Sequence, residues 1–183
     1  MRKLVITENM TLDGCIEMLD DWFEPQAQDD DLMEESHRQD AEADALLLGK
    51  QTFEDFRGYW PAQTDDRTGI ADYLNRVAKY VVSSTIDDPG WANSTVLRGD
   101  PVREAEVLKA REGKDIVLTG SISLAHALIS AGIVDEYRMF VYPVVQGRGR
   151  ALFPTGARPK LRLIAEPKSF SSKVVLLRYG AQG

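Results

Sequence analysis

The segment Leu118-Thr119-Gly120-Ser121 joins a short apolar run to a helical pattern, and it is the part of the chain best suited to bind a charged ligand. The run Ile116–Leu118 has the character of a buried strand, and leucines recur at helix spacing after Ser121. A strand that turns through glycine into a helix presents free N–H groups and the positive end of the helix dipole at one point. The segment therefore suits a phosphate group, although Gly-Ser could also serve turn geometry and helix capping alone.

A second segment of the same kind lies upstream, where the apolar run Ala45–Leu48 ends at Gly49. Gly49 would let the backbone pass close to a bound pyrophosphate, and the Thr52 hydroxyl could donate to it. Together the two junctions predict a nucleotide cofactor. The downstream segment is not a G-x-G-x-x-G motif, because Gly120 is its only glycine, so the ordinary dinucleotide-binding motif is not predicted.

Length and composition indicate one globular domain. The chain has 183 residues, of which 43% are apolar and 28% are charged. No apolar run approaches the roughly 20 residues of a membrane span, and the apolar stretch near Met1 is too short for a signal peptide. A single cysteine, Cys15, fits a reducing compartment, so we predict a cytoplasmic protein. With two histidines, a transition-metal site is not expected.

Charge is distributed unevenly along the chain, whose net charge is −7. Residues 20–44 carry eleven acidic side chains against one arginine, and residues 138–178 carry nine basic side chains against one acidic one. This asymmetry could form an acidic lip and a basic wall around one site, complementary faces of a dimer, or two solvated surfaces. A sequence pI of about 4.9 disfavours a nucleic-acid partner.

Short apolar runs alternate with helical patterns along most of the chain, which predicts an α/β fold with a central, mostly parallel sheet and helices on both faces. After Gly132 the pattern changes to strands alone, which predicts a C-terminal antiparallel hairpin. No linker or repeat divides the chain, so residues 1–183 are predicted to form a single domain. The expected strands are 4–7, 45–49, 80–83, 95–97, 116–119, 137–145, 160–167 and 173–179, and the expected helices are 29–43, 51–56, 70–77, 102–111 and 122–131.

Six local patterns occur in a fixed order along the chain. They are Thr11-Leu12-Asp13-Gly14, Leu47–Phe53, Val82-Ser83-Ser84, Leu118–Ser121, Gly132–Glu136 and Pro143–Gly149. Together they resemble the dihydrofolate reductase-like superfamily, specifically the branch related to the C-terminal reductase domain of the bifunctional riboflavin-biosynthesis deaminase/reductase. The resemblance covers nearly the whole chain, and it implies a dihydrofolate reductase-like fold, NADPH as the cofactor and a homodimer.

The resemblance assigns NADPH contacts to several of these patterns. Lys50 occupies the position where the superfamily usually has an arginine that binds the 2′-phosphate of NADPH. The alternative role for Lys50 is that of a solvated residue at the start of a helix. Hydroxyl groups after the third expected strand could bind the same phosphate or the adenosine ribose, or could serve a turn, and Arg98 could add charge beside the adenine. The implied cofactor-binding residues are Gly49, Lys50, Thr52, Ser83, Ser84, Thr85, Arg98, Gly120, Ser121 and Ile122.

The same resemblance places the reaction near Asp13, which matches the SLDG pattern of the family beside the nicotinamide and could deliver a proton. The alternative for Asp13 is an Asp-Gly turn. Dihydrofolate reductases carry one carboxylate in the first helix to protonate the pterin, and nothing in the sequence selects among the five acids at 29–35, of which Asp30 is our second candidate. A flat substrate ring could stack on Trp22, Tyr59 or Trp60, or these aromatic side chains could fill the core.

We therefore predict an NADPH-dependent oxidoreductase that transfers a hydride to a C=N or C=O bond of a small heterocyclic or ribosylamino-pyrimidine-like substrate. Riboflavin-pathway reductases carry an Asp-Asp-Pro segment after the second strand, and this chain does not, so the substrate stays open. The alternative is a non-catalytic dimeric module that binds a nucleotide. No metal, nucleic acid or membrane is expected as a partner.

Overall fold

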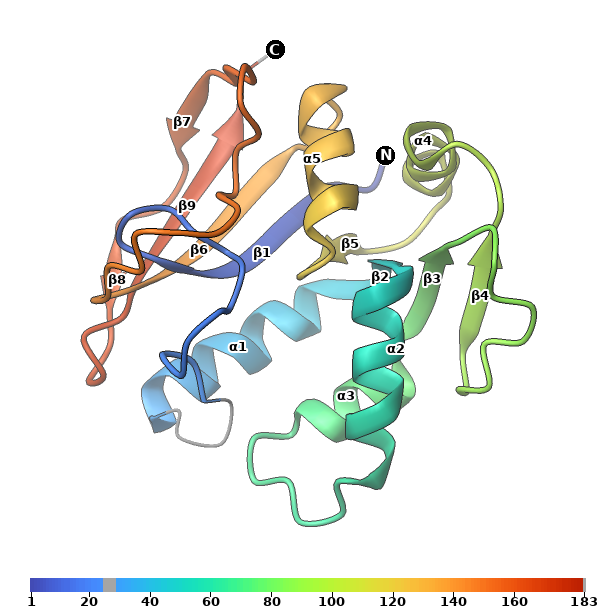
Figure 1. Ribbon diagram of the computed structural model, residues 1–183, viewed down its shortest axis with the longest axis horizontal. Helices are drawn as coiled ribbons and strands as arrows, with labels where there is room; N and C mark the ends of the chain where they lie inside the picture. The colour runs from blue at the N-terminus through green and yellow to red at the C-terminus, as the bar shows by residue number, and fades with distance from the viewer. Residues whose placement is uncertain (25–28, 183) are drawn as a thin grey trace.

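A computed structural model describes residues 1–24 and 29–182. All strands of this part of the chain belong to one large sheet (Figure 1). The order of the strands is β4-β3-β2-β5-β1-β6-β9-β7, with β8 paired to β9. Neighbours from β4 to β6 are parallel, and the pairs made by β9 are antiparallel. The strands are β1 (Leu4–Thr11), β2 (Ala43–Gly49), β3 (Ala78–Val82), β4 (Ser94–Leu97), β5 (Asp115–Leu118), β6 (Glu136–Tyr142), β7 (Leu161–Leu163), β8 (Lys168–Ser169) and β9 (Val175–Ala181).

Helices cover both faces of the sheet, as the sequence predicts. The first three helices lie on one face and the last two on the other, which Figure 1 shows below and above the sheet. A short 3-10 helix, Trp60–Ala62, follows the second helix. The helices are α1 (Asp30–Glu42), α2 (Lys50–Tyr59), α3 (Ile70–Arg76), α4 (Pro101–Ala110) and α5 (Ile122–Ser130).

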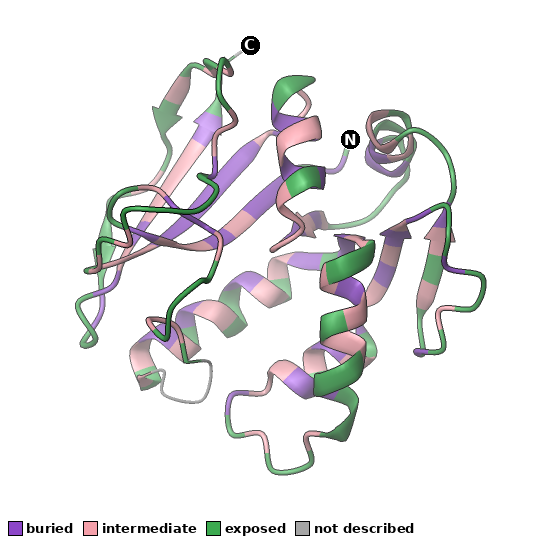
Figure 2. Cartoon of the chain, viewed as in Figure 1, coloured by how far each residue is buried: buried purple, intermediate pink, exposed green. Residues whose placement is uncertain are grey.

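The core consists of two main apolar layers, one on each face of the central strands, and Figure 2 shows buried residues concentrated there. Leu4 and Ile6 of β1 pack with Leu128 of α5 on one face. Leu48 of β2 packs with Phe53 of α2 on the other. Because side chains on a strand alternate between faces, the central strands are apolar on both sides, which is typical of a parallel sheet covered by helices.

The first strand is longer than the sequence predicts, and this difference creates the site. Its apolar run stops at Thr7, but β1 continues to Thr11 because residues 5–11 pair with residues 136–142 of β6. On its other side β1 pairs with β5 only as far as Ile6, which lies opposite Leu118. Residues 7–11 therefore extend beyond the end of β5, and the polar side chains among them border the space left there.

The C-terminal antiparallel part is confirmed with shorter strands. β7 and β8 each pair with β9, so the expected long hairpin is split into two short pairings. β6 ends at Tyr142 rather than at residue 145, and it lies between β1 and β9, so neither of its edges is free for a second subunit. Phe140 packs against Phe170, and Tyr142 packs against Trp22, within one chain. The apolar character of β6 therefore needs no partner copy, and the homodimer stays a prediction.

In the part of the chain that the structure describes, the helices are all too short or too polar to cross a membrane.

Candidate functional site

A cavity of about 820 Å³ opens beyond the ends of β2 and β5, and it is lined from both sides of the sheet, by residues of α1, α2 and α3 and by the start of α5. Polar residues of the extended part of β1 form one wall, and residues of α2 and of the start of α5 form another. In parallel α/β sheets, ligands bind beyond the carboxyl ends of the strands, where neighbouring connections leave in different directions. The position of this cavity is therefore that of a ligand site.

The two predicted phosphate-binding junctions meet at this cavity. The Gly49 N–H donates to Ser121 Oγ at 2.8 Å, and the Ser121 N–H donates to Thr52 Oγ1 at 2.7 Å. Each hydroxyl oxygen accepts a backbone hydrogen bond and keeps its own hydrogen for another acceptor. The structure thus brings together Gly49, Thr52, Gly120 and Ser121, and Ile122 lines the same cavity.

Gly120 and Ser121 adopt conformations that the sequence does not reveal. Gly120 has a φ of +60°, and a Cβ atom there would lie 3.0 Å from Thr52 Cγ2, so only glycine fits without strain. Ser121 has a φ of +49° and makes no side-chain capping bond to α5, contrary to the predicted N-cap. Its left-handed backbone turns the hydroxyl towards Gly49, and the side chain joins the two junctions instead of capping the helix.

The predicted 2′-phosphate residues form a cluster at the outer end of β3. Lys50 lines the cavity, and its Nζ donates to Thr85 Oγ1 at 2.9 Å. Ser83 is buried and accepts the N–H groups of Thr85 and Ile86, both at 3.2 Å, so it holds the turn. Arg98 donates to the carbonyl oxygens of Ser84 and Ile86 at 3.3 and 2.9 Å. Lys50 and Thr85 are the members of this cluster that connect it to the cavity.

Asp13 does not line the cavity in the described structure. Its side chain instead binds the loop that contains Gln146 and Gly147. Its carboxyl accepts the Thr11 hydroxyl at 2.6 Å and the N–H groups of Gln146 and Gly147 at 3.2 and 2.8 Å. These hydrogen bonds, the Thr11 hydroxyl first, lower the pKa of Asp13. An exposed carboxylate with a lowered pKa is poorly suited to donate a proton at neutral pH. Its geometry fits the loop-forming alternative.

The acids at the start of α1 lie away from the cavity, and two of them bind other segments of the chain. Asp30 is exposed on the first turn of the helix. Asp31 accepts both the N–H and the hydroxyl of Ser171 at 3.0 Å, which ties α1 to the turn between β8 and β9. Glu35 is buried and pairs with Arg38 and Lys168, and these partners lower its pKa to about 2 against the opposing effect of burial. None of these three side chains lines the cavity.

Asp40, further along α1, is the carboxyl group of that helix that lines the cavity. Burial raises its pKa to about 6, although His37 and Arg76 act in the opposite direction. Tyr73 and Arg138 also line the cavity. Tyr73 Oη and Arg138 Nη1 are buried and have no hydrogen-bond partner in the described residues. Sequence reasoning missed Asp40, although its spacing of eight residues from Leu32 through Ser36 is the signal that all three share a helix face.

Glu8 is the second carboxyl group that sequence reasoning missed. It lies in the extended part of β1, is buried and lines the cavity. Burial raises the pKa of Glu8 well above its ordinary value, and a hydrogen bond from the Gly120 N–H opposes this only in part. Its Oε1 has no partner among the described residues. A charged residue after an apolar run usually indicates that a strand has ended. The sequence therefore does not indicate that Glu8 lies within β1.

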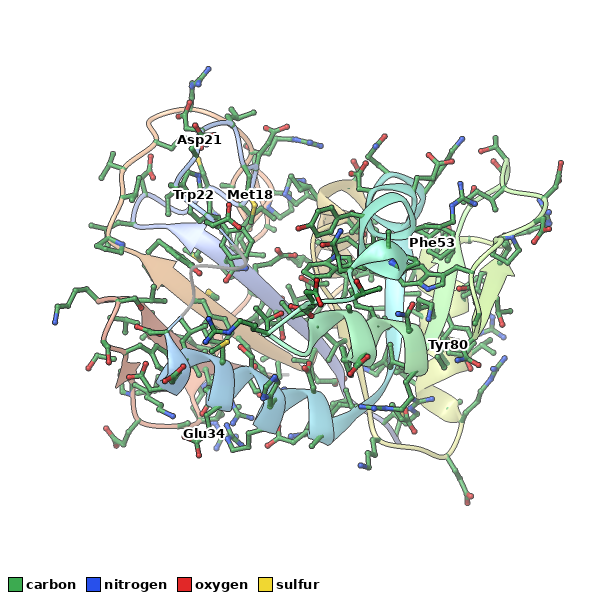
Figure 3. The ribbon with its side chains drawn as sticks, turned by 90° about the horizontal axis from the view of Figure 1, so that it is seen from below. Met18, Asp21, Trp22, Glu34, Phe53 and Tyr80 are labelled. Carbon is green, nitrogen blue, oxygen red and sulfur yellow. The ribbon has the colours of Figure 1, made fainter. Side chains whose placement is uncertain are left out.

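Two of the three predicted stacking residues border the cavity. Tyr59 and Trp60 line it, whereas Trp22 does not. Trp22 Nε1 donates to Gln146 Oε1 at 2.9 Å, and its ring packs against Tyr142 with centroids 5.2 Å apart. Figure 3 shows Trp22 beside Met18 in the segment after β1. The residues of this segment that line the cavity are Ile16, Glu17, Met18 and Phe23.

No group of three or more histidine, cysteine, aspartate or glutamate side chains is placed to hold a metal ion within residues 1–24 and 29–182.

Comparison with known proteins supports the fold described above. An uncharacterized protein of Bacillus subtilis (strain 168), YyaP, is 31% identical over 191 residues, which cover 100% of this chain and 96% of the relative. A Shewanella sp. PV-4 protein provisionally assigned to riboflavin biosynthesis has the same fold, with a TM-score of 0.74, 16% identity and 99% of both chains covered.

A Thermotoga maritima diaminohydroxyphosphoribosylaminopyrimidine deaminase/5-amino-6-(5-phosphoribosylamino)uracil reductase also shares the fold, with a TM-score of 0.66 and 15% identity. The match covers 99% of this chain and 57% of that one. The family model of the RibD C-terminal domain matches residues 2–176. This chain therefore belongs to the RibD C-terminal domain family, a family of riboflavin-pathway-type reductases.

Proposed function

We propose that this protein is an NADPH-dependent reductase that adds a hydride to a C=N or C=O bond of a small heterocyclic substrate. The observation that carries the proposal is that one cavity joins a glycine-and-hydroxyl junction to a region with a protonatable carboxyl group, that of Asp40. Membership of a reductase family supports the reaction class and suggests a nicotinamide cofactor. A ribosylamino-pyrimidine-like compound is the first substrate to test.

The residues at the two junctions fit the phosphates of a dinucleotide. Ser121 and Thr52 each hold a hydroxyl hydrogen ready for an acceptor, and a Cβ atom at Gly120 would close the approach between them. The starts of α2 and α5 add the positive ends of two helix dipoles. Lys50, whose side chain is about half exposed, would hold the 2′-phosphate that distinguishes NADPH from NADH. When bound, the cofactor supplies the hydride.

The substrate would lie between α1 and α3, where Asp40, Tyr73 and Arg138 border the cavity. Arg138 Nη1 would donate to a carbonyl oxygen of the substrate, because this N–H group is buried and has no partner among the described residues. Asp40 would hold the proton that the reduced nitrogen or oxygen needs, since its raised pKa of about 6 keeps a usable fraction protonated near neutral pH. Tyr59 and Trp60 would cover the flat ring.

The state of Asp40 favours turnover over the non-catalytic alternative. A carboxyl group whose pKa is raised by burial lowers the stability of the folded protein at neutral pH. Such groups concentrate at catalytic sites, where the unfavourable environment serves proton transfer. A module that only binds a nucleotide would gain nothing from this group.

The test is the consumption of NADPH by the purified protein with a panel of ribosylamino-pyrimidines, pterins and quinones. We expect turnover with at least one of them, and we expect Asp40→Asn to lower kcat about a hundredfold or more with little change in NADPH affinity. Asp30→Asn is the matched control, because it removes an exposed carboxylate from the same helix. Tight NADPH binding without turnover on any member of the panel would favour the non-catalytic module.

A further inference from the structure

The proposed reaction leaves the buried Glu8 side chain without a role. Only 4% of its surface is exposed, and it lines the cavity from the extended part of β1. The Gly120 N–H donates to its carboxyl group, whereas Oε1 has no partner among the described residues. A buried polar atom without a partner costs free energy, about 1–3 kcal/mol in typical cases, unless a ligand or a water molecule completes it.

The environment of Glu8 favours the neutral acid. Burial of a carboxylate beside one N–H donor and no cation costs more solvation energy than that hydrogen bond returns. A neutral carboxyl group has one O–H donor and one carbonyl acceptor. Because the Gly120 N–H occupies the carbonyl oxygen, Oε1 carries the hydrogen and can donate it to a ligand.

The position of Glu8 points to the cofactor rather than to the substrate. Strand side chains alternate between faces, and Glu8 pairs with Met139, which packs in the core on the α5 side. Its neighbour Thr7 pairs with Arg138, which faces α1 through an ion pair with Glu42 at 2.9 Å. Glu8 is therefore on the side of the Gly120 junction, and the opposite side of the strand faces the proposed substrate region.

Resting on the proposed function, we infer that Glu8 binds the carboxamide group of the nicotinamide ring. The Oε1–H group donates to the carboxamide oxygen, and the other carboxyl oxygen accepts from the carboxamide NH₂ while it still accepts from Gly120. An acid and a primary amide are complementary in this way, because each offers one donor and one acceptor side by side. Two parallel hydrogen bonds fix the rotation of the carboxamide, and with it the face of the ring that is turned towards the substrate.

Two variants of Glu8 separate this role from a purely structural one. Glu8→Gln keeps a donor and an acceptor of the same shape, and Glu8→Leu keeps the volume without either. Calorimetry would measure binding of NADP⁺ and of 2′-phospho-ADP-ribose, which lacks nicotinamide. We expect Glu8→Gln to bind NADP⁺ within about threefold of wild type and Glu8→Leu to bind it about tenfold more weakly. All three proteins should bind 2′-phospho-ADP-ribose equally.

Infrared spectroscopy provides a second readout that a structural role would not change. At about pH 8, where Asp40 with its pKa of about 6 is ionised, the C=O band of a protonated carboxyl group should be present in wild type and absent in Glu8→Gln. This band should shift on addition of NADP⁺ but not of 2′-phospho-ADP-ribose. Equal NADP⁺ binding by wild type and Glu8→Leu, or equal weakening of both ligands, would overturn the inference. If wild type bound no dinucleotide at all, the proposed function would fail and this inference with it.

Discussion

Three of the five buried side-chain atoms that lack hydrogen-bond partners in the described structure belong to residues that line one cavity. They are Glu8 Oε1, Tyr73 Oη and Arg138 Nη1, and they come from β1, α3 and β6. Buried polar atoms in folded proteins are nearly always paired, so three exceptions around one cavity indicate groups that a ligand completes. At the scale of single residues, these atoms identify the site more directly than the sequence motifs do.

The pH dependence of Asp40 follows from its pKa of about 6, raised by burial from 3.8. Because the folded state favours the protonated form, the contribution of Asp40 to stability is full below about pH 4 and is lost as the pH rises through 6. Asp40→Asn should therefore raise the free energy of unfolding at pH 7 by about 1–3 kcal/mol while it lowers turnover. Urea unfolding at pH 4 and pH 7 measures the first effect, and a variant less stable than wild type at pH 7 would contradict it.

Wild-type kcat/KM should fall as the pH rises through about 6, and the Asp40→Asn profile should be flat. A profile in the variant identical to that of wild type would assign the titration to another group.

We expect cofactor choice to depend on Lys50, which lines the cavity and whose Nζ donates to Thr85 Oγ1 at 2.9 Å. We expect NADPH to bind about tenfold more tightly than NADH, roughly 1.4 kcal/mol, because only NADPH carries a 2′-phosphate. Lys50→Ala should remove most of this difference, and Lys50→Arg should keep it, since arginine retains the charge and adds a second N–H contact. Calorimetry with both cofactors measures the effect. Equal loss of NADPH and NADH affinity in Lys50→Ala would show that the Lys50 side chain does not bind the 2′-phosphate.

At the scale of elements, the proposed cofactor site is formed by the junctions of β2 with α2 and of β5 with α5. Gly120→Ala should abolish dinucleotide binding, because its Cβ would press on Thr52 at 3.0 Å between the two junctions. Gly132→Ala is the matched control, since Gly132 also has a positive φ of +69° but a Cβ there meets no atom within 4 Å. Gly120→Ala should lose more stability than Gly132→Ala, because only its Cβ also presses on Thr52, and only Gly120→Ala should lose NADPH binding by calorimetry. If a folded Gly120→Ala protein still bound NADPH, Gly120 would be needed for the turn and not for cofactor binding.

The sequence predicts the elements well and the site only in part, and β1 shows why. The apolar runs locate β2, β3, β4 and β5, and the glycines locate the junctions that meet at the cavity. The continuation of β1 past Thr7 depends on its pairing with β6, more than 120 residues away in the chain, which no local pattern reports. Glu8 lies in that continuation and was missed for this reason.

The acids of α1 illustrate a second limit. Eight-residue spacing places Leu32 and Asp40 on one helix face, but which face meets the cavity is decided by packing against Phe140 and Phe170. Local charge alone favours Asp30 at the helix start, where negative side chains complement the helix dipole without any role in chemistry. Asp13 likewise matches a family pattern and still serves a loop, because its partners Gln146 and Gly147 come from a distant segment.

At the scale of the whole molecule, a homodimer stays a prediction based on family resemblance. β6 lies between β1 and β9, so a dimer formed by pairing the edge of β6 with a second copy is not expected. Static light scattering at micromolar concentration should report a mass near twice 20.4 kDa. A monomer mass that persists as the protein is concentrated would contradict it.

The central claim is that one cavity holds NADPH and a substrate side by side, and a crystal structure of the protein soaked with NADP⁺ tests it most directly. The account predicts electron density for the pyrophosphate between Gly49 and Gly120 and for the 2′-phosphate at Lys50. The nicotinamide should reach Glu8 and leave open space beside Asp40. Density for the dinucleotide outside this cavity, or no density at saturating NADP⁺, would contradict the account.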